Sequence, residues 1–386
     1  MQQMTAIMPA RRKWRDGLRE EFFPRDRRRD IDGLRALAVA AVVLMHAGWL
    51  SGGFVGVDIF VVISGYFMGR SALMQDPFQP ARFACRRLYR LLPALLCMVA
   101  VISAGMLWWV LQSDRADIAL NGAYALVYLS NIWAAGHVGY FEGQALAYPF
   151  LHTWSLSLEM QFYAVIFVVA VMLPRVRWRL YALLGILAVS AGCSLHDHLA
   201  GDGQGYYRIT DRMWEFALGT LIWMLPRPRL PRAVANVAYA LALCVLVGAC
   251  VFYVRDYACP SWGVVFPCLA VVAIIMLPHT DVARVTLGPV SPLGVISYSV
   301  YLWHWPVIVL ANYLLMFQVA GLTMAGVLVV ALLVGLLSYV FVERTFLDYE
   351  GRAGTVARNR GALALVCACG LLSAGLGYVS YTSRVH

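Results

Sequence analysis

The first apolar stretch of the chain carries two side chains suited to anion binding and proton transfer. Arg35 and His46 are eleven residues apart, which is about three helical turns or about 16 Å, so both lie on one helix face. An imidazole within an apolar helix exchanges a proton near neutral pH and is suited to be a general base. The alternatives are that Arg35 only anchors the helix at the cytoplasmic surface and that His46 is an ordinary core histidine.

A motif of small residues with one acid follows, in the segment GGFVGVDIFVVISGY. Its glycines permit a tight turn between two helices, and Asp58 falls where the second helix begins. We expect Asp58 either to cap that helix or to orient the His46 imidazole. Ser64 lies inside the helix without a GxSxG motif, so we expect it to be a small packing residue rather than a nucleophile.

A basic amphipathic segment, RFACRRLYRLLPA, covers residues 82–94. It places Arg87 and Arg90 three residues apart on one helix face. Such segments are common at the cytoplasmic ends of membrane helices, but a guanidinium group also binds phosphate through two hydrogen bonds. We therefore expect either a positive anchor or a site for an anionic cytosolic ligand.

Two further apolar segments contain charged residues. In HTWSLSLEMQFY, helical spacing places four polar side chains on one stripe: His152, Ser155, Glu159 and Tyr163. A carboxylate in an apolar helix is poorly explained by packing, and we expect Glu159 to orient an imidazole or pair with an arginine. In DRMWEFALG, Arg212 and Glu215 are three residues apart and are expected to form an intrahelical ion pair.

The segment SYSVYLWHWP covers residues 297–306. Helical spacing places Tyr301 and His304 on the same face as Ser297. Trp303 and Trp305 are typical of an aromatic belt at a membrane surface. His304 therefore either faces a cavity or lies in that belt.

Composition indicates which elements must position these side chains. Of the 386 residues, 61% are hydrophobic and 13% are charged, compared with about 45–50% and about 25% in soluble domains. A bilayer-crossing helix takes about 20 apolar residues. We therefore expect an all-α, polytopic integral membrane bundle of about 10–11 transmembrane helices.

The expected spans are 33–50, 55–73, 91–112, 152–173, 180–196, 211–225, 233–254, 261–278, 294–317, 320–342 and 361–381. Residues 118–134 are also apolar, but a full span there would move the basic segment 175–179 to the opposite side. We expect a re-entrant segment or a short helix pair there. The expected domains are a basic cytoplasmic tail (1–32), a membrane domain (33–345), and a cytoplasmic loop with an additional C-terminal helix (346–386).

The distribution of Lys and Arg predicts the orientation. Nine of the 31 Lys and Arg residues fall in the first 29 positions, and the other basic segments lie between alternate spans. The positive-inside rule places them in the cytoplasm, with the N-terminus inside and the C-terminus periplasmic or extracellular. The basic tail indicates contact with anionic membrane lipid rather than nucleic acid.

The nine cysteines show no zinc-ligand spacing, so we expect no metal.

From about residue 30 to 345, the chain resembles the membrane acyltransferase-3 family of bacterial O-acyltransferases in six ordered motifs: RDIDGLRALAVAAVVLMH, GGFVGVDIFVVISGY, FACRRLYRLLPALL, LHTWSLSLEMQFY, DRMWEFALG and ISYSVYLWHWP. The resemblance implies transfer of an acyl group, usually acetyl from acetyl-CoA, to hydroxyls of surface glycans at the bacterial inner membrane. The family's motif residues fall on Arg35, His46, Arg87, Arg90 and Glu159. Relatives commonly have a second glutamate where this chain has Met160, which leaves Glu159 as the candidate.

These motifs suggest a mechanism. Acyl-CoA is expected to dock from the cytosol with its phosphates near three arginines: Arg35, Arg87 and Arg90. His46 then removes the proton from the acceptor hydroxyl or takes the acyl group itself, with Asp58 or Glu159 orienting the ring and Arg35 completing the catalytic group. Binding of the glycan or other hydroxyl acceptor is assigned to His152, Tyr163, Tyr301, His304 and Trp305.

A second function class remains open. A proton-coupled transporter or exporter of a glycan or small molecule would use the same buried charges as a proton relay. The absence of a visible inverted repeat and the six ordered motifs argue against a transporter.

Overall fold

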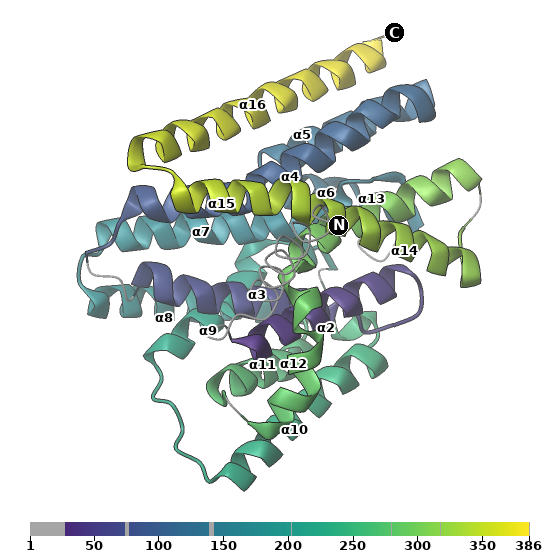
Figure 1. The fold of residues 1–386 in the computed structure, drawn as a ribbon. Coiled ribbons are helices and arrows are strands. Elements are labelled where there is room, and N and C mark those ends of the chain that lie inside the picture. The colour runs from purple at the N-terminus through teal and green to yellow at the C-terminus, as the bar shows by residue number, and fades with distance from the viewer. Residues whose placement is uncertain are drawn as a thin grey trace, which may run out of the picture.

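The structure is a computed structural model, and it describes residues 28–73, 77–138, 143–201, 203–278, 280–316 and 318–385. These residues form helices and contain no strand, which confirms the predicted all-α class (Figure 1). Of the basic tail predicted at 1–32, residues 1–27 lie outside the described part of the chain. The α-helices are α2 (Arg29–His46), α3 (Val55–Met68), α4 (Pro80–Trp109), α5 (Gln112–Leu126), α6 (Ser130–His137), α7 (Trp154–Met172), α8 (Val176–Ala200), α9 (Ile209–Leu221), α10 (Arg232–Phe252), α11 (Val265–Met276), α12 (Asp281–Val295), α13 (Ser297–Leu315), α14 (Gly321–Ser338), α15 (Arg344–Arg352) and α16 (Thr355–Val385).

Shorter helical segments connect or extend these helices. The π-helices η1 (Gly69–Leu73) and η8 (Tyr339–Glu343) continue α3 and α14. The 3-10 helices are η2 (Gly143–Ala147), η3 (Leu151–Thr153), η4 (Gly203–Tyr207), η5 (Ile222–Met224), η6 (Arg255–Tyr257) and η7 (Trp262–Val264).

The chain is a multi-pass membrane protein. Within the described residues, seven helices are long and apolar enough to cross a membrane, or eight if the bent pair of Trp262–Met276 and Asp281–Val295 forms one broken span. Each of the predicted span ranges falls on a helix, but α2, α9 and α13 do not pass this test. Four charged residues lie on α2, α9 has 13 residues, and α13 is rich in polar and aromatic residues. Other helices surround these three, so they need not be apolar on every side.

The segment predicted as re-entrant or a short helix pair is a helix pair. Its first helix, α5, ends at Leu126, the backbone turns at Tyr128 with φ 57°, and α6 begins at Ser130. In Figure 1, α5 runs alongside α16. Residues 118–134 therefore form no continuous spanning helix.

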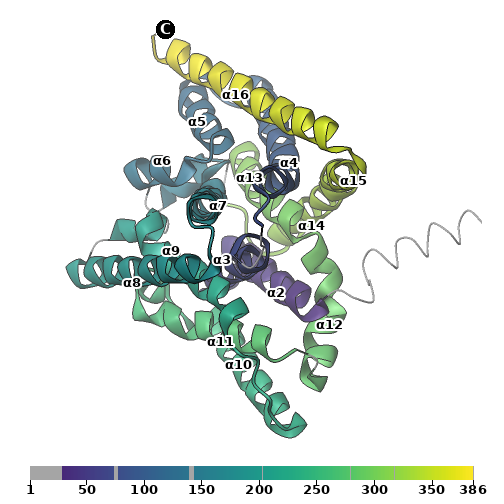
Figure 2. The same cartoon turned by 90° about the vertical axis from the view of Figure 1, so that its left-hand side faces the viewer.

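Two close helix contacts fix the positions of α2 and α3. A Cβ on Gly294 of α12 would lie 1.7 Å from the carbonyl oxygen of Asp32, so only glycine lets α12 approach α2 this closely. A Cβ on Gly65 of α3 would lie 2.0 Å from the carbonyl oxygen of Phe216 on α9. Small residues at membrane helix contacts allow such backbone approach. Figure 2 shows α2 and α3 at the centre of the bundle.

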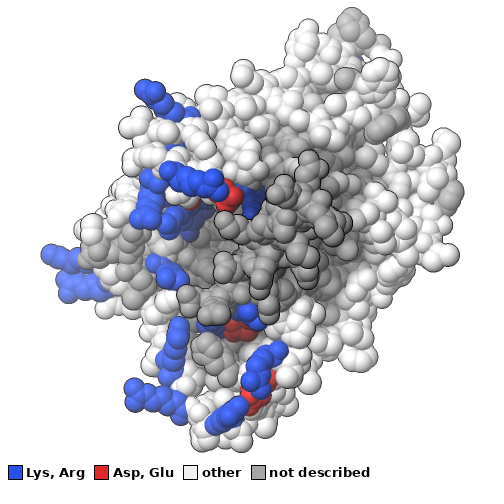
Figure 3. Space-filling view, in the orientation of Figure 1, with Lys and Arg blue, Asp and Glu red and all other residues white. Residues whose placement is uncertain are grey.

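Lys and Arg side chains gather along one side of the molecule, at the left of Figure 3, which is the side that faces the viewer in Figure 2. Arg179 was expected among the basic residues of this side, and it is in fact almost completely buried, at 2% exposure. Its guanidinium donates to the carbonyl oxygens of Ala72, Leu73, Ala170 and Leu173. These are carbonyls near helix C-termini, so the cation also interacts favourably with the helix dipoles.

Candidate active site

A cavity of about 950 Å³ lies within the bundle, lined by α2, α3, η1, α4, α7 and α13 together with Phe216 and Trp223. Its size falls at the upper end of the range of small-molecule pockets, about 300–1,000 Å³. The lining includes many cations: Arg28, Arg35, Arg70, Arg82, Arg86, Arg87 and Arg90. The lining carboxylates are Asp32 and Glu159. The cavity is therefore strongly positive.

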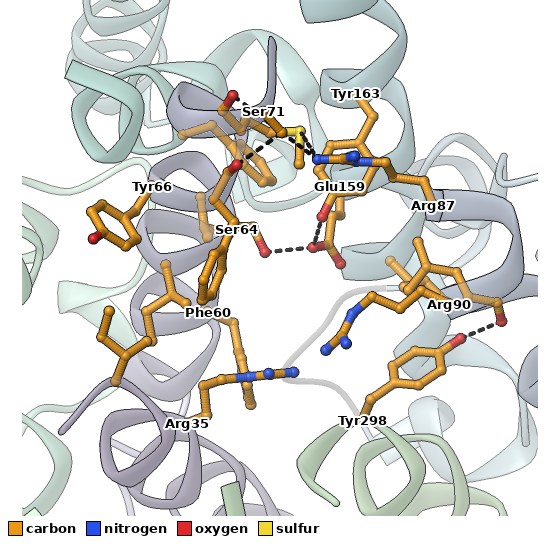
Figure 4. Close-up of a pocket in the computed structure, with 18 of the residues that line it drawn as sticks. Arg35, Phe60, Ser64, Tyr66, Ser71, Arg87, Arg90, Glu159, Tyr163 and Tyr298 are labelled. Carbon is orange, nitrogen blue, oxygen red and sulfur yellow. Dashed lines mark hydrogen bonds between the residues drawn. The ribbon is translucent and has the colours of Figure 1, made fainter. Parts of the chain in front are cut away.

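Two of these arginines converge. Arg35 reaches into the cavity from α2 and Arg90 from α4, and their side chains point toward one another (Figure 4). Tyr298 lies beside Arg90 and donates a hydrogen bond to the carbonyl of Leu91 (2.6 Å). Two converging guanidinium groups repel each other, and an anion between them converts that repulsion into attraction.

Arg87 is held against the cavity wall. Its guanidinium lies 4.0 Å from the centroid of the Phe83 ring, and it donates to the hydroxyl of Ser71 and to the sulfur of Met68 (3.6 Å). The predicted helix face of Arg87 and Arg90 therefore does face one site, as both line the cavity. Their surroundings differ, because Arg87 is packed on an aromatic ring while Arg90 points into the cavity.

Glu159 of α7 receives two hydroxyl hydrogen bonds. Ser64 of α3 and Tyr163 of α7 both donate to its Oε1 (Figure 4). Ser64 was predicted to be a packing residue, but it lines the cavity, and its hydroxyl on α3 contacts the carboxyl group of Glu159 on α7. The two hydroxyls thus hold the Glu159 carboxyl group in place in a cavity lined by cations.

A cluster of histidines lies at the other end of α2. His46, its last residue, places Nδ1 2.9 Å from Nε2 of His304 on α13, and the two rings meet edge to edge with nearly parallel planes and centroids 5.1 Å apart. The Trp305 ring lies 4.5 Å from the His46 ring, and its Nε1 donates to the carbonyl of Tyr148. His304 is completely buried. It therefore packs inside the protein rather than in an aromatic belt, as do Trp303 and Trp305.

Tyr301 stands between the cavity and the histidines. It lines the cavity together with Ser155, and the two hydroxyl oxygens are 2.7 Å apart. Its hydroxyl also donates to the carbonyl of His152, while its own carbonyl lies 2.5 Å from Nδ1 of His304. The His152 ring is edge-on to His304 with centroids 5.6 Å apart. Tyr301 thus contacts both polar regions through different atoms.

Asp58 belongs to a third cluster, apart from the histidines. It pairs with Arg212, which also bonds Glu215 at 3.0 Å, and all three side chains are buried. The guanidinium additionally lies 4.7 Å from the Tyr206 ring and 5.6 Å from the Trp154 ring. The predicted pair of Arg212 and Glu215 is confirmed. A buried ion cluster of this kind joins helices, in this case α3 and α9.

The predicted orientation of His46 by a carboxylate is not what the structure shows. Asp58 contacts Arg212, Glu159 contacts Ser64 and Tyr163, and the His46 ring contacts His304 instead. The sequence stripe from His152 to Tyr163 divides in the same way: Ser155, Glu159 and Tyr163 line the cavity, while His152 lies with the histidines. The sequence predicted an imidazole or an arginine as the partner of Glu159, and its hydrogen-bond partners are instead two hydroxyls.

Several cavity residues were missed as site residues. Arg82 and Arg86 were treated only as part of a basic segment, Arg70 was assigned no role, and Ser64 was treated only as a packing residue. The positive charge of the segments that hold these arginines could have indicated an anion-binding site. By contrast, nothing in the sequence around Ser64 indicates that it contacts a carboxylate 95 residues away in the chain.

Comparison with known proteins agrees with the family resemblance of the six sequence motifs. A family model described as an acyltransferase domain matches residues 28–342. The chain is 69% identical, over the full length of both, to a Komagataeibacter xylinus protein named as a candidate membrane-bound transacylase, BcsY. It is 30% identical to the Listeria monocytogenes peptidoglycan O-acetyltransferase OatA over 81% of this chain and 54% of that protein. It is 32% identical to the Staphylococcus aureus O-acetyltransferase OatA over 81% of this chain and 56% of that protein. No solved structure matches.

Proposed function

The chain belongs to the acyltransferase-3 family of membrane enzymes, and from that premise we propose that it transfers acetyl from cytosolic acetyl-CoA to a hydroxyl of a cell-surface or exported glycan. The glycan class is supported by the names of the OatA relatives, which describe peptidoglycan O-acetyltransferase and O-acetyltransferase activity. The chain spans about half the length of those relatives, so the proposal concerns only the membrane domain that they share.

The observation that carries this proposal is the convergence of Arg35 and Arg90 in the cavity. Coenzyme A carries several phosphate groups, and guanidinium groups bind phosphate through paired, charge-assisted hydrogen bonds. An elongated donor with an anionic head and an uncharged thioester arm fits a site that is positive at one end. The fit supports acyl-CoA over a donor without phosphate.

We assign the chemistry to His46 at the opposite end of α2. In the transfer step the acceptor oxygen bonds to the acyl carbon and the carbon–sulfur bond of the thioester breaks. The hydroxyl proton passes to His46, which then returns it to the departing thiolate, so the acceptor leaves as an ester and the donor as free CoA. Arg35 and His46 are separated by about 16 Å along α2, so the anionic head of the donor and its reacting carbonyl lie at different depths.

This separation also supports transfer across the membrane. With the basic side of the molecule in the cytoplasm, the donor enters from the cytosol and the acceptor approaches the His46 end from the opposite side. The C-terminus is then outside the cytoplasm. An alkaline phosphatase fusion after Tyr381 should be active, and a fusion ending near Arg229 should be inactive.

The decisive experiment reconstitutes the purified protein in vesicles that hold a glycan acceptor in the lumen. For molecules whose basic side faces outward, external labelled acetyl-CoA should acetylate the luminal glycan. Wild-type protein should lose this activity when His46 is replaced by Ala. Transfer only to acceptor added on the same side as CoA would overturn the transmembrane route. No transfer to any hydroxyl acceptor, with substrate transport instead, would favour the exporter class.

A further inference from the structure

We propose that His304 is a positioning residue that fixes the proton of the His46 ring on Nδ1, so that the lone pair of His46 is on Nε2 and serves as the base. The proposal deepens the proposed function, because it rests on His46 being the base. It is carried by a chain of hydrogen bonds that starts at a backbone carbonyl and ends at the His46 ring.

The chain of hydrogen bonds has a fixed direction. The carbonyl oxygen of Tyr301 can only accept, so Nδ1 of His304, 2.5 Å away, must donate its proton. In a neutral imidazole the second nitrogen is then an acceptor. Nε2 of His304 therefore accepts from Nδ1–H of His46 at 2.9 Å. A neutral His46 that donates through Nδ1 has its lone pair on Nε2.

The surroundings of the pair favour neutral rings. His304 is completely buried, and His152 lies edge-on to it at 5.6 Å. Nε2 of His152 is 3.1 Å from the carbonyl of Leu302 and so is a donor, which leaves His304 Nε2 to His46. A charged His304 would carry protons on both nitrogens and could not accept from His46.

His46 and His304 are arranged like a general base and the group that orients it. In serine hydrolases a carboxylate accepts the Nδ1 proton of the histidine and holds the ring in the productive tautomer. Here the accepting group is an imidazole, which sets the tautomer without placing a negative charge beside the base. When the proton of the acceptor hydroxyl binds Nε2 of His46, the bond from Nδ1–H to His304 stays intact.

Two substitutions at His304 separate its two hydrogen bonds. His304→Gln can place an amide oxygen near the position of Nε2 and so keeps an acceptor for His46. His304→Asn can place an amide N–H near the position of Nδ1, which keeps the bond to the Tyr301 carbonyl but offers His46 no acceptor. We expect His304→Gln to keep kcat within about tenfold of wild type, and His304→Asn to lose about 10²–10⁴ in kcat, the loss typical of a removed or misoriented base. The KM for acetyl-CoA should stay unchanged in both, because the arginines of the cavity are untouched.

The matched control is the same pair of substitutions at His198, which is exposed on α8. Neither should change kcat. Rates are compared per folded molecule, measured by size-exclusion chromatography and thermal unfolding in detergent. Equal activity of the Gln and Asn variants of His304, or a more active Asn variant, overturns the positioning role. If His46→Ala retains activity, the proposed function fails first, and the two failures are thereby distinguished.

A second measurement does not require any His304 variant to fold. Nitrogen-15 NMR of histidine-labelled wild-type protein reports which ring nitrogen carries the proton, and the His46 signals are identified by their loss in His46→Ala. We expect His46 to be protonated on Nδ1. A His46 ring protonated on Nε2 overturns the proposal.

Discussion

The two ends of α2 hold different kinds of polar site. At the N-terminal end, Arg35 faces a cavity lined by many cations and two carboxylates. At the C-terminal end, His46 contacts the His304 ring, which lies nearly parallel to it, and the tilted ring of Trp305 in a compact cluster. A cluster of cations suits the binding of an anion, whereas a packed ring with a defined hydrogen-bond partner suits proton transfer. Under the proposed function, the two ends of α2 thus separate donor binding from chemistry.

A third region shows that an arginine is not by itself a binding residue. Arg212 is as deeply buried as any side chain in the described part of the protein, but Asp58 and Glu215 occupy its guanidinium. Arg90 instead points into the cavity toward another arginine. The local charge balance distinguishes the buried, ion-paired arginine from those that line the cavity.

The largest expected effect comes from breaking the histidine end of α2. His46→Ala should lower kcat by about 10²–10⁴, because the acceptor hydroxyl loses its base. The KM for acetyl-CoA should not change, since the cavity arginines remain. Steady-state kinetics in detergent or vesicles measure both values. A raised KM for acetyl-CoA with an unchanged kcat would indicate that His46 binds the donor, and the two ends of α2 would then belong to one binding site.

Removing the buried arginine should affect stability instead of donor affinity. Arg212→Leu leaves Asp58 and Glu215 as buried carboxylates without a cation, and breaking such a buried pair costs about 3–5 kcal/mol. Thermal unfolding in detergent should show a clearly lower midpoint. The control is Arg232→Leu, which breaks an exposed pair with Asp281 and should change the midpoint much less. An unchanged midpoint for Arg212→Leu would mean that the cluster is not structural.

At the cavity end, replacing both Arg87 and Arg90 by Gln should weaken donor binding. Each lost charge-assisted hydrogen bond contributes about 1.5–3 kcal/mol, so the KM for acetyl-CoA should rise at least about tenfold, while kcat falls less. The wild-type KM should rise with salt, and that dependence should be weaker in the double variant. Arg177→Gln, which changes an exposed arginine outside the cavity lining, is the control. An unchanged KM with a depressed kcat would exclude a binding role.

The smallest effect is expected for the hydroxyls around Glu159. Ser64→Ala and Tyr163→Phe each remove one of the two donors to Oε1, and a typical hydrogen bond contributes about 0.5–1.5 kcal/mol. We expect each single variant to lower kcat about tenfold or less and the double variant to lower it further. A loss with Ser64→Ala as large as that with His46→Ala would indicate that Ser64 takes the acyl group itself.

Much of this architecture is readable from local sequence. Every predicted apolar span falls on a helix, whereas α12 and α15 lie essentially outside those spans. The helical period correctly placed Arg87 with Arg90 and Arg212 with Glu215 on shared faces. The short helix pair at 118–134 followed from the balance of basic loops. The all-α class is confirmed. Within the described residues seven or eight helices pass the length and hydropathy test, and α2, α9 and α13 do not, because α2 carries four charged residues, α9 is short and α13 is rich in polar and aromatic residues.

The partners of the site residues were decided by helix packing. His46 meets a histidine 258 residues away, Asp58 an arginine 154 residues away, and Glu159 a serine 95 residues away. A helical period depends only on neighbours along the chain, so sequence alone determined which face each residue occupies and that the cavity end is basic. Which faces meet depends on close contacts such as that of Gly294 with the backbone of Asp32, which exist only once α12 packs against α2. For that reason the sequence predicted a carboxylate as the partner of His46, and only the packing of the helices shows that the partner is the imidazole of His304.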